Sequence, residues 1–285
     1  MNQPVDTKDP RRVMAAVQDV FRSMFPSGSM ESVERVFSWA TACFYGGYPG
    51  YQAIDVKYHD LEHTLQATWC LVRILKGRQQ AGIEPELTEH QFLLGLCAIL
   101  LHDAGYLKQT NDLEGTGAKY TLVHVDRSAA LAARLLAEKG YTPGDIEAVQ
   151  RIIQCTGVKL QISVVPFRAT WEHFLGSALG TADLLGQIAA ADYIEKLPVL
   201  YEEFAEAARF NGSKNSPVAI YGSVDDLLRK TPEFWEKIVW PRLENDFAGV
   251  YRFLNEPYPY GPNDYLIAAT QNLARLKQLL GGMGR

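Results

Sequence analysis

The chain has 285 residues, 47% of them hydrophobic, and a formal net charge of −5. This length can bury a large core. Basic and acidic residues are interleaved, with no basic run typical of proteins that bind nucleic acids or anionic membranes. The N-terminal residues lack the apolar stretch of a signal peptide, and the longest apolar run, 92–101, is too short to cross a membrane. We therefore expect a cytoplasmic protein. The four cysteines are far apart in the sequence, which favours buried, reduced thiols.

Apolar residues recur at helical spacing along most of the chain. The pattern predicts helices at about 11–25, 30–44, 59–80, 88–104, 124–139, 143–155, 170–190, 192–210, 224–254 and 263–280. Residues 106–122 and 211–223 have the composition of loops. Strand signals are few, so we predict an all-α fold. Residues 1–9 are expected to be flexible and 10–285 to form one domain, with a core at about 45–200 and additional C-terminal helices. A separate C-terminal subdomain after about residue 211 is the alternative.

Histidine is scarce, yet two of the six fall in the segment Tyr58-His59-Asp60-Leu61-Glu62-His63. If this segment is helical, His59 and His63 lie one turn apart on the same face. Two such imidazoles can share a metal ion, or one can bind the ion while the other reaches a substrate. A solvated helix start with incidental histidines is the other interpretation.

Two further positions carry ionisable groups in apolar surroundings. His102 and Asp103 end a helix that is apolar on nearly all sides, and Asp183 lies among apolar residues of the predicted helix 170–190. A buried carboxylate needs a cation or several hydrogen-bond donors. The alternatives are a helix end that reaches solvent at His102 and a cap at Asp183. Together with His63, these residues form a mixed set suited to Mn, Fe, Zn or Mg, which we expect to meet in the core of a helical bundle.

The order of these residues resembles the HD-domain superfamily, which is defined by a His, an adjacent His-Asp pair and a later Asp carried on helices. The segment YHDLEHT is similar to the YHNxxHA motif of cyclic-nucleotide phosphodiesterases. The resemblance covers about residues 45–200 and implies an HD-domain helical bundle. It also implies that His59 is the general acid and that His63, His102, Asp103 and Asp183 are metal ligands.

This sequence departs from the phosphodiesterase pattern at two of these positions. Asp60 stands in place of the Asn, and Tyr106 stands where the pattern HDxxHPG has its second His. His124 loosely resembles the position that binds a second metal ion in HD-GYP phosphodiesterases, and a plain helix-start histidine is the alternative. These departures leave the substrate open.

The resemblance implies a metal-dependent phosphohydrolase or phosphodiesterase that uses one or two divalent ions. A bound metal lowers the pKa of water from about 15.7 to near 7. Asp103 is expected to bridge two ions and hold the resulting hydroxide, while His59 protonates the leaving oxygen. The expected partner is a small phosphoester or nucleotide-like substrate, with a homodimer as an option. Candidates for phosphate binding are Lys108, Lys119, Arg127 and Lys196, although each also fits a solvated surface charge.

Two other functions remain open from the sequence. Some HD-domain proteins use a di-iron pair for oxygenase chemistry, and His124 would supply one of the extra ligands that this requires. The third reading is a non-catalytic sensor or scaffold that retains a metal site. Metal content and activity toward phosphoesters would distinguish these functions.

Overall fold

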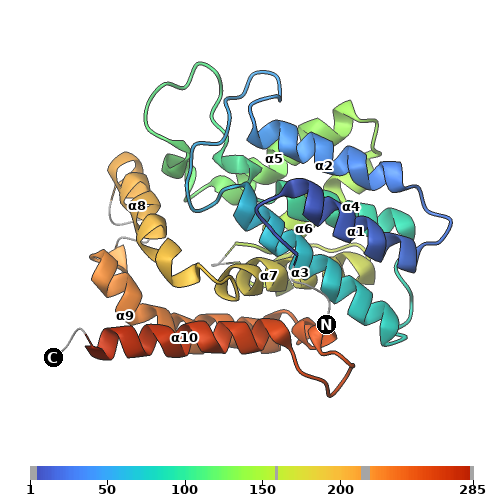
Figure 1. The fold of residues 1–285 in the computed structure, drawn as a ribbon. Helices are drawn as coiled ribbons and strands as arrows, with labels where there is room; N and C mark the ends of the chain where they lie inside the picture. The colour runs from blue at the N-terminus through green and yellow to red at the C-terminus, as the bar shows by residue number, and fades with distance from the viewer. Residues whose placement is uncertain (1–4, 158–159, 213–218, 283–285) are drawn as a thin grey trace.

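A computed structural model describes residues 5–157, 160–212 and 219–282 (Figure 1). Within these residues the chain is all-α, as predicted, and its β-type pairing is limited to an isolated bridge between Tyr51 and Gln109. The α-helices in chain order are α1 (Pro10–Met24), α2 (Met30–Phe44), α3 (Leu61–Gln80), α4 (Glu89–Leu101), α5 (His124–Glu138), α6 (Pro143–Gln154), α7 (Thr170–Ile188), α8 (Tyr193–Asn211), α9 (Val224–Phe234) and α10 (Asp264–Gly282).

Local signals in the sequence fix several helix starts. Thr88 caps α4 in a capping box with Gln91, in which each side chain bonds the backbone N–H of the other residue. Thr142 caps α6 in the same way, and Pro143 occupies the first helical position, where its missing N–H costs nothing. Both helices therefore begin where these residues predict.

The centre of the molecule is formed by α3, α4 and α7. All residues of α4 from Leu94 to Leu101 are buried, as expected for a helix that is apolar on nearly every side. The helices α3 and α7 approach closely at Gly186, where a side-chain Cβ would lie 3.0 Å from backbone atoms of Ala67. These two helices carry His63 and Asp183, so their packing sets the distance between the two residues.

The other helices surround this centre. The pair α1 and α2 packs against α3 and α4, while α5 and α6 pack against α4. In Figure 1, α10 runs along the bottom of the molecule beneath α7. Asn272 of α10 donates hydrogen bonds of 2.8 and 2.7 Å to the carbonyls of Ile188 and Ala190 at the end of α7. One continuous buried cluster extends from Val13 in α1 to Leu276 in α10.

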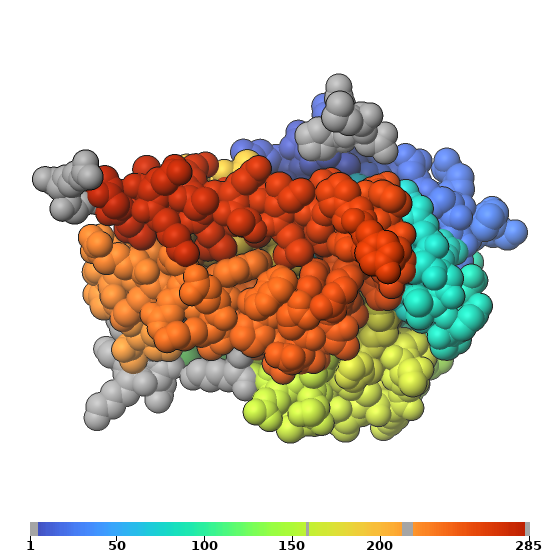
Figure 2. Space-filling model, turned by 90° about the horizontal axis from the view of Figure 1, so that it is seen from below, coloured from blue at the N-terminus to red at the C-terminus, as the bar shows by residue number. Residues whose placement is uncertain are grey.

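The expected continuous α-helix at 224–254 is wrong. The α-helix α9 ends at Phe234 and is followed by two π-helical turns, η6 (Trp235–Val239) and η7 (Arg242–Asp246). Pro232 and Pro241 lack the N–H that an α-helical bond requires, which favours a widened helix here. The chain then turns at Ala248 and Gly249, which have φ values of 53° and 65°, before the 3₁₀ turn η8 (Val250–Leu254). Figure 2 shows this segment lying beside α10.

Three short 3₁₀ turns complete the described structure. Two of them, η1 (Ala104–Tyr106) and η2 (Gly117–Tyr120), lie at or within the loop predicted at 106–122, and the third is η3 (Ile162–Val164). Part of the loop predicted at 211–223 falls outside the described residues, as does part of the N-terminal stretch expected to be flexible.

The described residues include no single helix with the length and hydropathy of a membrane span; α7 and α8 meet those limits only as a pair, across a bend of 110°. All four cysteines are buried, unpaired thiols, in agreement with the expectation from their spacing.

Candidate metal centre

Four ionisable side chains meet where the start of α3, the end of α4 and the middle of α7 come together. His63 lies in the first turn of α3, where the Asp60 side chain caps the helix and accepts a 2.9 Å hydrogen bond from the His63 N–H. His102 caps the C-terminus of α4, and Asp103 follows it directly. Asp183 lies within α7. Three elements distant in sequence thus contribute to one cluster.

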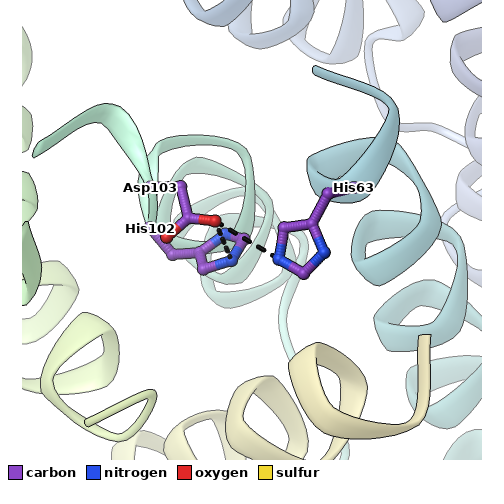
Figure 3. Close-up of side chains that lie close together, drawn as sticks. All are labelled: His63, His102 and Asp103. Carbon is purple, nitrogen blue, oxygen red and sulfur yellow. Dashed lines mark ion pairs between the residues drawn. The ribbon is translucent and has the colours of Figure 1, made fainter. Parts of the chain in front are cut away.

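Both imidazoles face both carboxylates. The Nε2 atom of His63 lies 3.3 Å from Asp103 Oδ2 and 3.2 Å from Asp183 Oδ1, and the Nε2 atom of His102 lies 3.3 and 3.4 Å from the same two oxygens. Figure 3 shows His63 reaching from α3 toward His102 and Asp103 at the end of α4. The donor atoms of these three residues all lie within 4.8 Å of one another, a spacing that a single metal ion can bridge.

The hydrogen bonds of His102 and Asp103 leave lone pairs facing this cluster. His102 Nδ1 lies 2.7 Å from the carbonyl of Ile99, so it carries the proton, and the lone pair of Nε2 points the other way. Both His102 Nε2 and Asp103 Oδ2 are buried and make no hydrogen bond within the described structure. Buried polar atoms are almost always satisfied. A divalent cation would satisfy both, and a set of two imidazoles and two carboxylates suits Mn, Fe, Zn or Mg.

The electrostatics of the cluster favour positive charge. Burial lowers the pKa of His63, but its contacts with Asp103 and Asp183 outweigh this and raise that pKa to about 9. Burial likewise raises the pKa of Asp103, and the positive charge of His102 outweighs it and holds the pKa well below its usual value. In the absence of a metal, protonated imidazoles therefore supply the positive charge that the carboxylates of Asp103 and Asp183 attract.

His59 does not lie on α3, contrary to the helical spacing expected from the sequence. The helix begins at Leu61, because Asp60 occupies the cap position. The rings of His59 and His63 are nevertheless close, with centroids 5.5 Å apart. His59 therefore borders the cluster from the segment before the helix.

Glu203 of α8 holds His59 in place and was not predicted from the sequence. Its Oε2 atom lies 2.6 Å from His59 Nδ1, and its Oε1 atom accepts hydrogen bonds from the backbone N–H groups of Lys57 and Tyr58 at 2.9 and 2.6 Å. The carboxylate is buried, with 5% of the residue exposed. One signal was available: Glu203, Glu206 and Ala207 have the spacing of a buried helical face, which is unusual for glutamates.

His124 also lies beside the cluster. Its Nδ1 atom is 2.7 Å from the carbonyl of Thr121, and its Nε2 atom is 3.8 Å from Asp103 Oδ1, the oxygen that does not face His63. Burial lowers the pKa of His124, so its ring is neutral and can accept a metal. The Asp103 carboxylate is thus shared between the main cluster and His124.

Tyr106, at the position where the HDxxH pattern has a histidine, packs against two of these imidazoles, whose own centroids are 6.0 Å apart. Its ring stacks on His59 and on His124, each with a centroid distance of 4.7 Å. The side chain is fully buried, and its hydroxyl, near Thr121, has no hydrogen bond of normal geometry. Tyr106 therefore fixes the planes of both rings.

One side of the centre reaches solvent. The side chains of His59, Asp183 and His124 are 15%, 14% and 21% exposed, whereas those of His63, His102 and Asp103 are at most 3% exposed. A small molecule can therefore approach over His59, Asp183 and His124, with the deepest ligands beneath it.

Two of the three lysines predicted to bind phosphate, Lys108 and Lys119, form ion pairs and hydrogen bonds within the protein. Lys108 Nζ lies 2.9 Å from Asp55 Oδ2 and donates a 2.6 Å hydrogen bond to the carbonyl of Gly115. Lys119 pairs with Asp112 and donates to the carbonyl of Glu114. Both ammonium groups stabilise the 108–120 loop, and a role toward phosphate stays a prediction.

Arg127 and Lys196 are engaged in the same way. The Arg127 guanidinium donates 2.7 Å hydrogen bonds to the carbonyls of Gly105 and Leu107, on either side of Tyr106. Lys196 Nζ lies 3.2 Å from Glu62 Oε2 and 3.8 Å from both Asp60 and Asp192. Arg127 thus supports the segment that follows Asp103, and Lys196 neutralises acidic groups beside the start of α3.

Comparison with known proteins assigns the chain to a family. No curated protein matches the sequence. A family model described as Npun_R2479-like matches residues 13–251, which include His59, His63, His102, Asp103, His124, Asp183 and Glu203. The match covers most of the chain, and the protein therefore belongs to the Npun_R2479-like family.

Proposed function

We propose that this protein is a metal-dependent phosphohydrolase of the HD-domain type, which cleaves a phosphate ester of a small, nucleotide-like substrate. The observation that carries the proposal is the meeting of two imidazole Nε2 atoms with two carboxylate oxygens at 3.2–3.4 Å. The resemblance of the His, His-Asp and Asp order to the HD-domain superfamily supports it.

In this proposal His63, His102, Asp103 and Asp183 hold one divalent ion. When bound, the ion neutralises phosphate charge and lowers the pKa of water, which supplies a nucleophile at neutral pH. Asp103 Oδ1 and His124 Nε2, which lie 3.8 Å apart, offer two ligands for a second ion. A substrate phosphate would approach from the exposed side of the centre, over Asp183 and His124.

His59 is the proposed general acid. Its Nδ1 atom is bound to Glu203, so its Nε2 atom is the one free to donate a proton to the leaving oxygen. Stacking on Tyr106 fixes the plane of the imidazole ring. The acid is thus oriented by one carboxylate and one aromatic ring before a substrate binds.

The proposal is tested by measuring the metal content of the purified protein together with hydrolysis of bis(p-nitrophenyl) phosphate and a panel of nucleotides. We expect Asp103→Ala to lose both metal and activity, and His59→Ala to keep the metal but slow turnover about 100-fold or more. His173→Ala is the matched control, because His173 is exposed and lies almost three helical turns before Asp183, the nearest cluster residue on α7.

Three results would contradict parts of this proposal. If metal-loaded protein cleaves no member of the panel, the phosphohydrolase assignment fails. Bound iron together with O₂ consumption would instead favour the di-iron oxygenase, and metal without either activity would favour a sensor. Loss of metal in His59→Ala would overturn the division of roles between His59 and His63.

A further inference from the structure

A groove with a volume of about 910 Å³ lies along α3, apart from the donor atoms of the metal centre. Its walls are α3, the turn between α7 and α8, the first described residues of the chain, and the segment from η8 to the start of α10. In Figure 1 the N-terminal segment, the lower end of α3 and the right-hand end of α10 meet in this region. The volume is that of a site for a small organic ligand.

Three side chains on one face of α3 project into the groove. Trp69, Arg73 and Lys76 are spaced four and three residues apart, so they form a stripe along the helix. Arg73 is neutralised by Glu256 at 3.4 Å and Asp264 at 3.9 Å. Lys76 is partly buried, and it forms no ion pair or hydrogen bond with any residue of the described structure. A cation without a partner thus lies at one end of this stripe.

Two further acidic groups of the groove are compensated at its opposite end, and a third, Asp6, accepts a 3.0 Å hydrogen bond from the backbone N–H of Lys8. Glu62 and Asp192 both line the groove, and both lie within 4 Å of the Lys196 ammonium. The turn between α7 and α8 contributes the small apolar residues Ala189, Ala190 and Ala191 to the wall of the groove. The groove therefore combines a partly buried indole ring, a wall of small apolar residues and the ammonium groups of Lys8 and Lys76, which form no ion pair within the described structure.

We propose that this groove binds a small anion that carries a flat ring. The ring would lie against Trp69, and its acidic group would pair with Lys76. Trp69 and Lys76 are two helical turns apart, or about 10 Å along the axis, so the ligand is an elongated aromatic acid or a nucleotide rather than a simple inorganic anion. The proposal does not depend on the reaction of the metal centre.

The test uses 8-anilinonaphthalene-1-sulfonate, an aromatic anion that no phosphohydrolase can cleave, titrated into the full-length protein in the presence of EDTA. Lys76→Glu and Trp69→Ala should each weaken binding about 10-fold, while Trp69→Phe, which keeps a ring, should stay within about 2-fold of wild type. Lys139→Glu and Trp39→Ala are matched controls, because Lys139 lies over the Trp39 ring elsewhere on the molecule. Circular dichroism checks that every variant folds.

Competition identifies the source of the anion. Displacement of the probe by AMP favours a nucleotide, and displacement by indole-3-acetate favours an aromatic carboxylate; either result supports the proposal if Lys76→Glu abolishes it. Unchanged probe binding in both Lys76→Glu and Trp69→Ala, or equal losses in the groove and control variants, would overturn the proposal.

Discussion

The Nδ1 atom of His59 and the Oε2 atom of Glu203 form a 2.6 Å hydrogen bond, although the two residues are 144 positions apart in the sequence. Glu203 lies on α8, and only 5% of the residue is exposed. Its carboxylate also accepts hydrogen bonds from the two backbone N–H groups immediately before His59. A single side chain thus fixes both the ring of the proposed acid and the backbone that carries it.

Glu203→Gln should reduce turnover without removing the metal. The amide can still accept a backbone hydrogen bond, but it no longer holds His59 Nδ1 through a charged contact, so we expect kcat to fall about 10- to 100-fold. The measurement is steady-state hydrolysis together with metal content. Glu202→Gln, an exposed neighbour, should have little effect. Equal losses in the two variants would show that Glu203 does not act through His59.

Asp183→Asn should weaken metal binding. Asp183 Oδ1 contacts both imidazoles, and replacing it removes one of the two negative charges in the cluster. Loss of groups that only support ligands costs about 10- to 100-fold in affinity, so a direct ligand should cost at least as much. Competition with a chromophoric chelator measures the change. Asp192→Asn, at the start of α8, should leave the affinity unchanged. If Asp183→Asn also binds the metal as tightly as wild type, Asp183 is excluded as a ligand.

The affinity for metal should rise with pH. His63 has a pKa of about 9 in the metal-free protein, whereas a metal ion requires the neutral ring. The pKa of His102 is raised as well, so binding below about pH 9 must release at least one proton. The apparent affinity should therefore increase by at least about 10-fold per pH unit between about 6.5 and 9. Calorimetry in two buffers of different ionisation enthalpy detects the released proton. An affinity that is independent of pH in this range would contradict the prediction.

The same groups set the stability of the metal-free protein. Because the pKa of His63 is raised, its contribution is fully present below pH 6.5, the ordinary pKa of histidine, and is lost as the pH rises through about 9. The pKa values of Asp103 and Asp183 are lowered, so their contributions are present above the ordinary value of 3.8 and are lost as the pH falls. Urea unfolding in EDTA should therefore show greatest stability between these limits, and added metal should extend it toward higher pH.

Most of the fold could be predicted because its signals are local. Thr88, Thr142 and Pro143 mark helix starts through contacts within one turn. The π-helical turns after α9 were missed, because an apolar pattern of helical period does not reveal that Pro232 and Pro241 interrupt the α-helical bonds. Periodicity indicates which face is buried but not how each backbone bond is made.

The residues of the metal centre likewise fall into those that the sequence could predict and those that it could not. His102, Asp103 and Asp183 could be identified because each is an ionisable group within an apolar helix, which requires a partner. The expected helical spacing of His59 and His63 was wrong, since Asp60 caps the helix between them. Glu203 could not be assigned to His59, because no spacing in the sequence indicates that α8 returns to this segment.

Substitution of Arg127 can distinguish a structural role for this residue from its predicted role in phosphate binding. Its guanidinium donates to two carbonyls that flank Tyr106 and lies 3.5 Å from the centroid of the Tyr120 ring. Arg127→Ala would leave these carbonyls unbonded, so we expect a loss of about 2–4 kcal/mol in the free energy of unfolding. Arg134→Ala on the same helix, where the side chain bonds only the exposed Tyr51 hydroxyl, should cost less than about 0.5 kcal/mol. Urea unfolding measures both, and KM for the best substrate separates the two roles. A raised KM with unchanged stability would show instead that Arg127 binds the substrate phosphate.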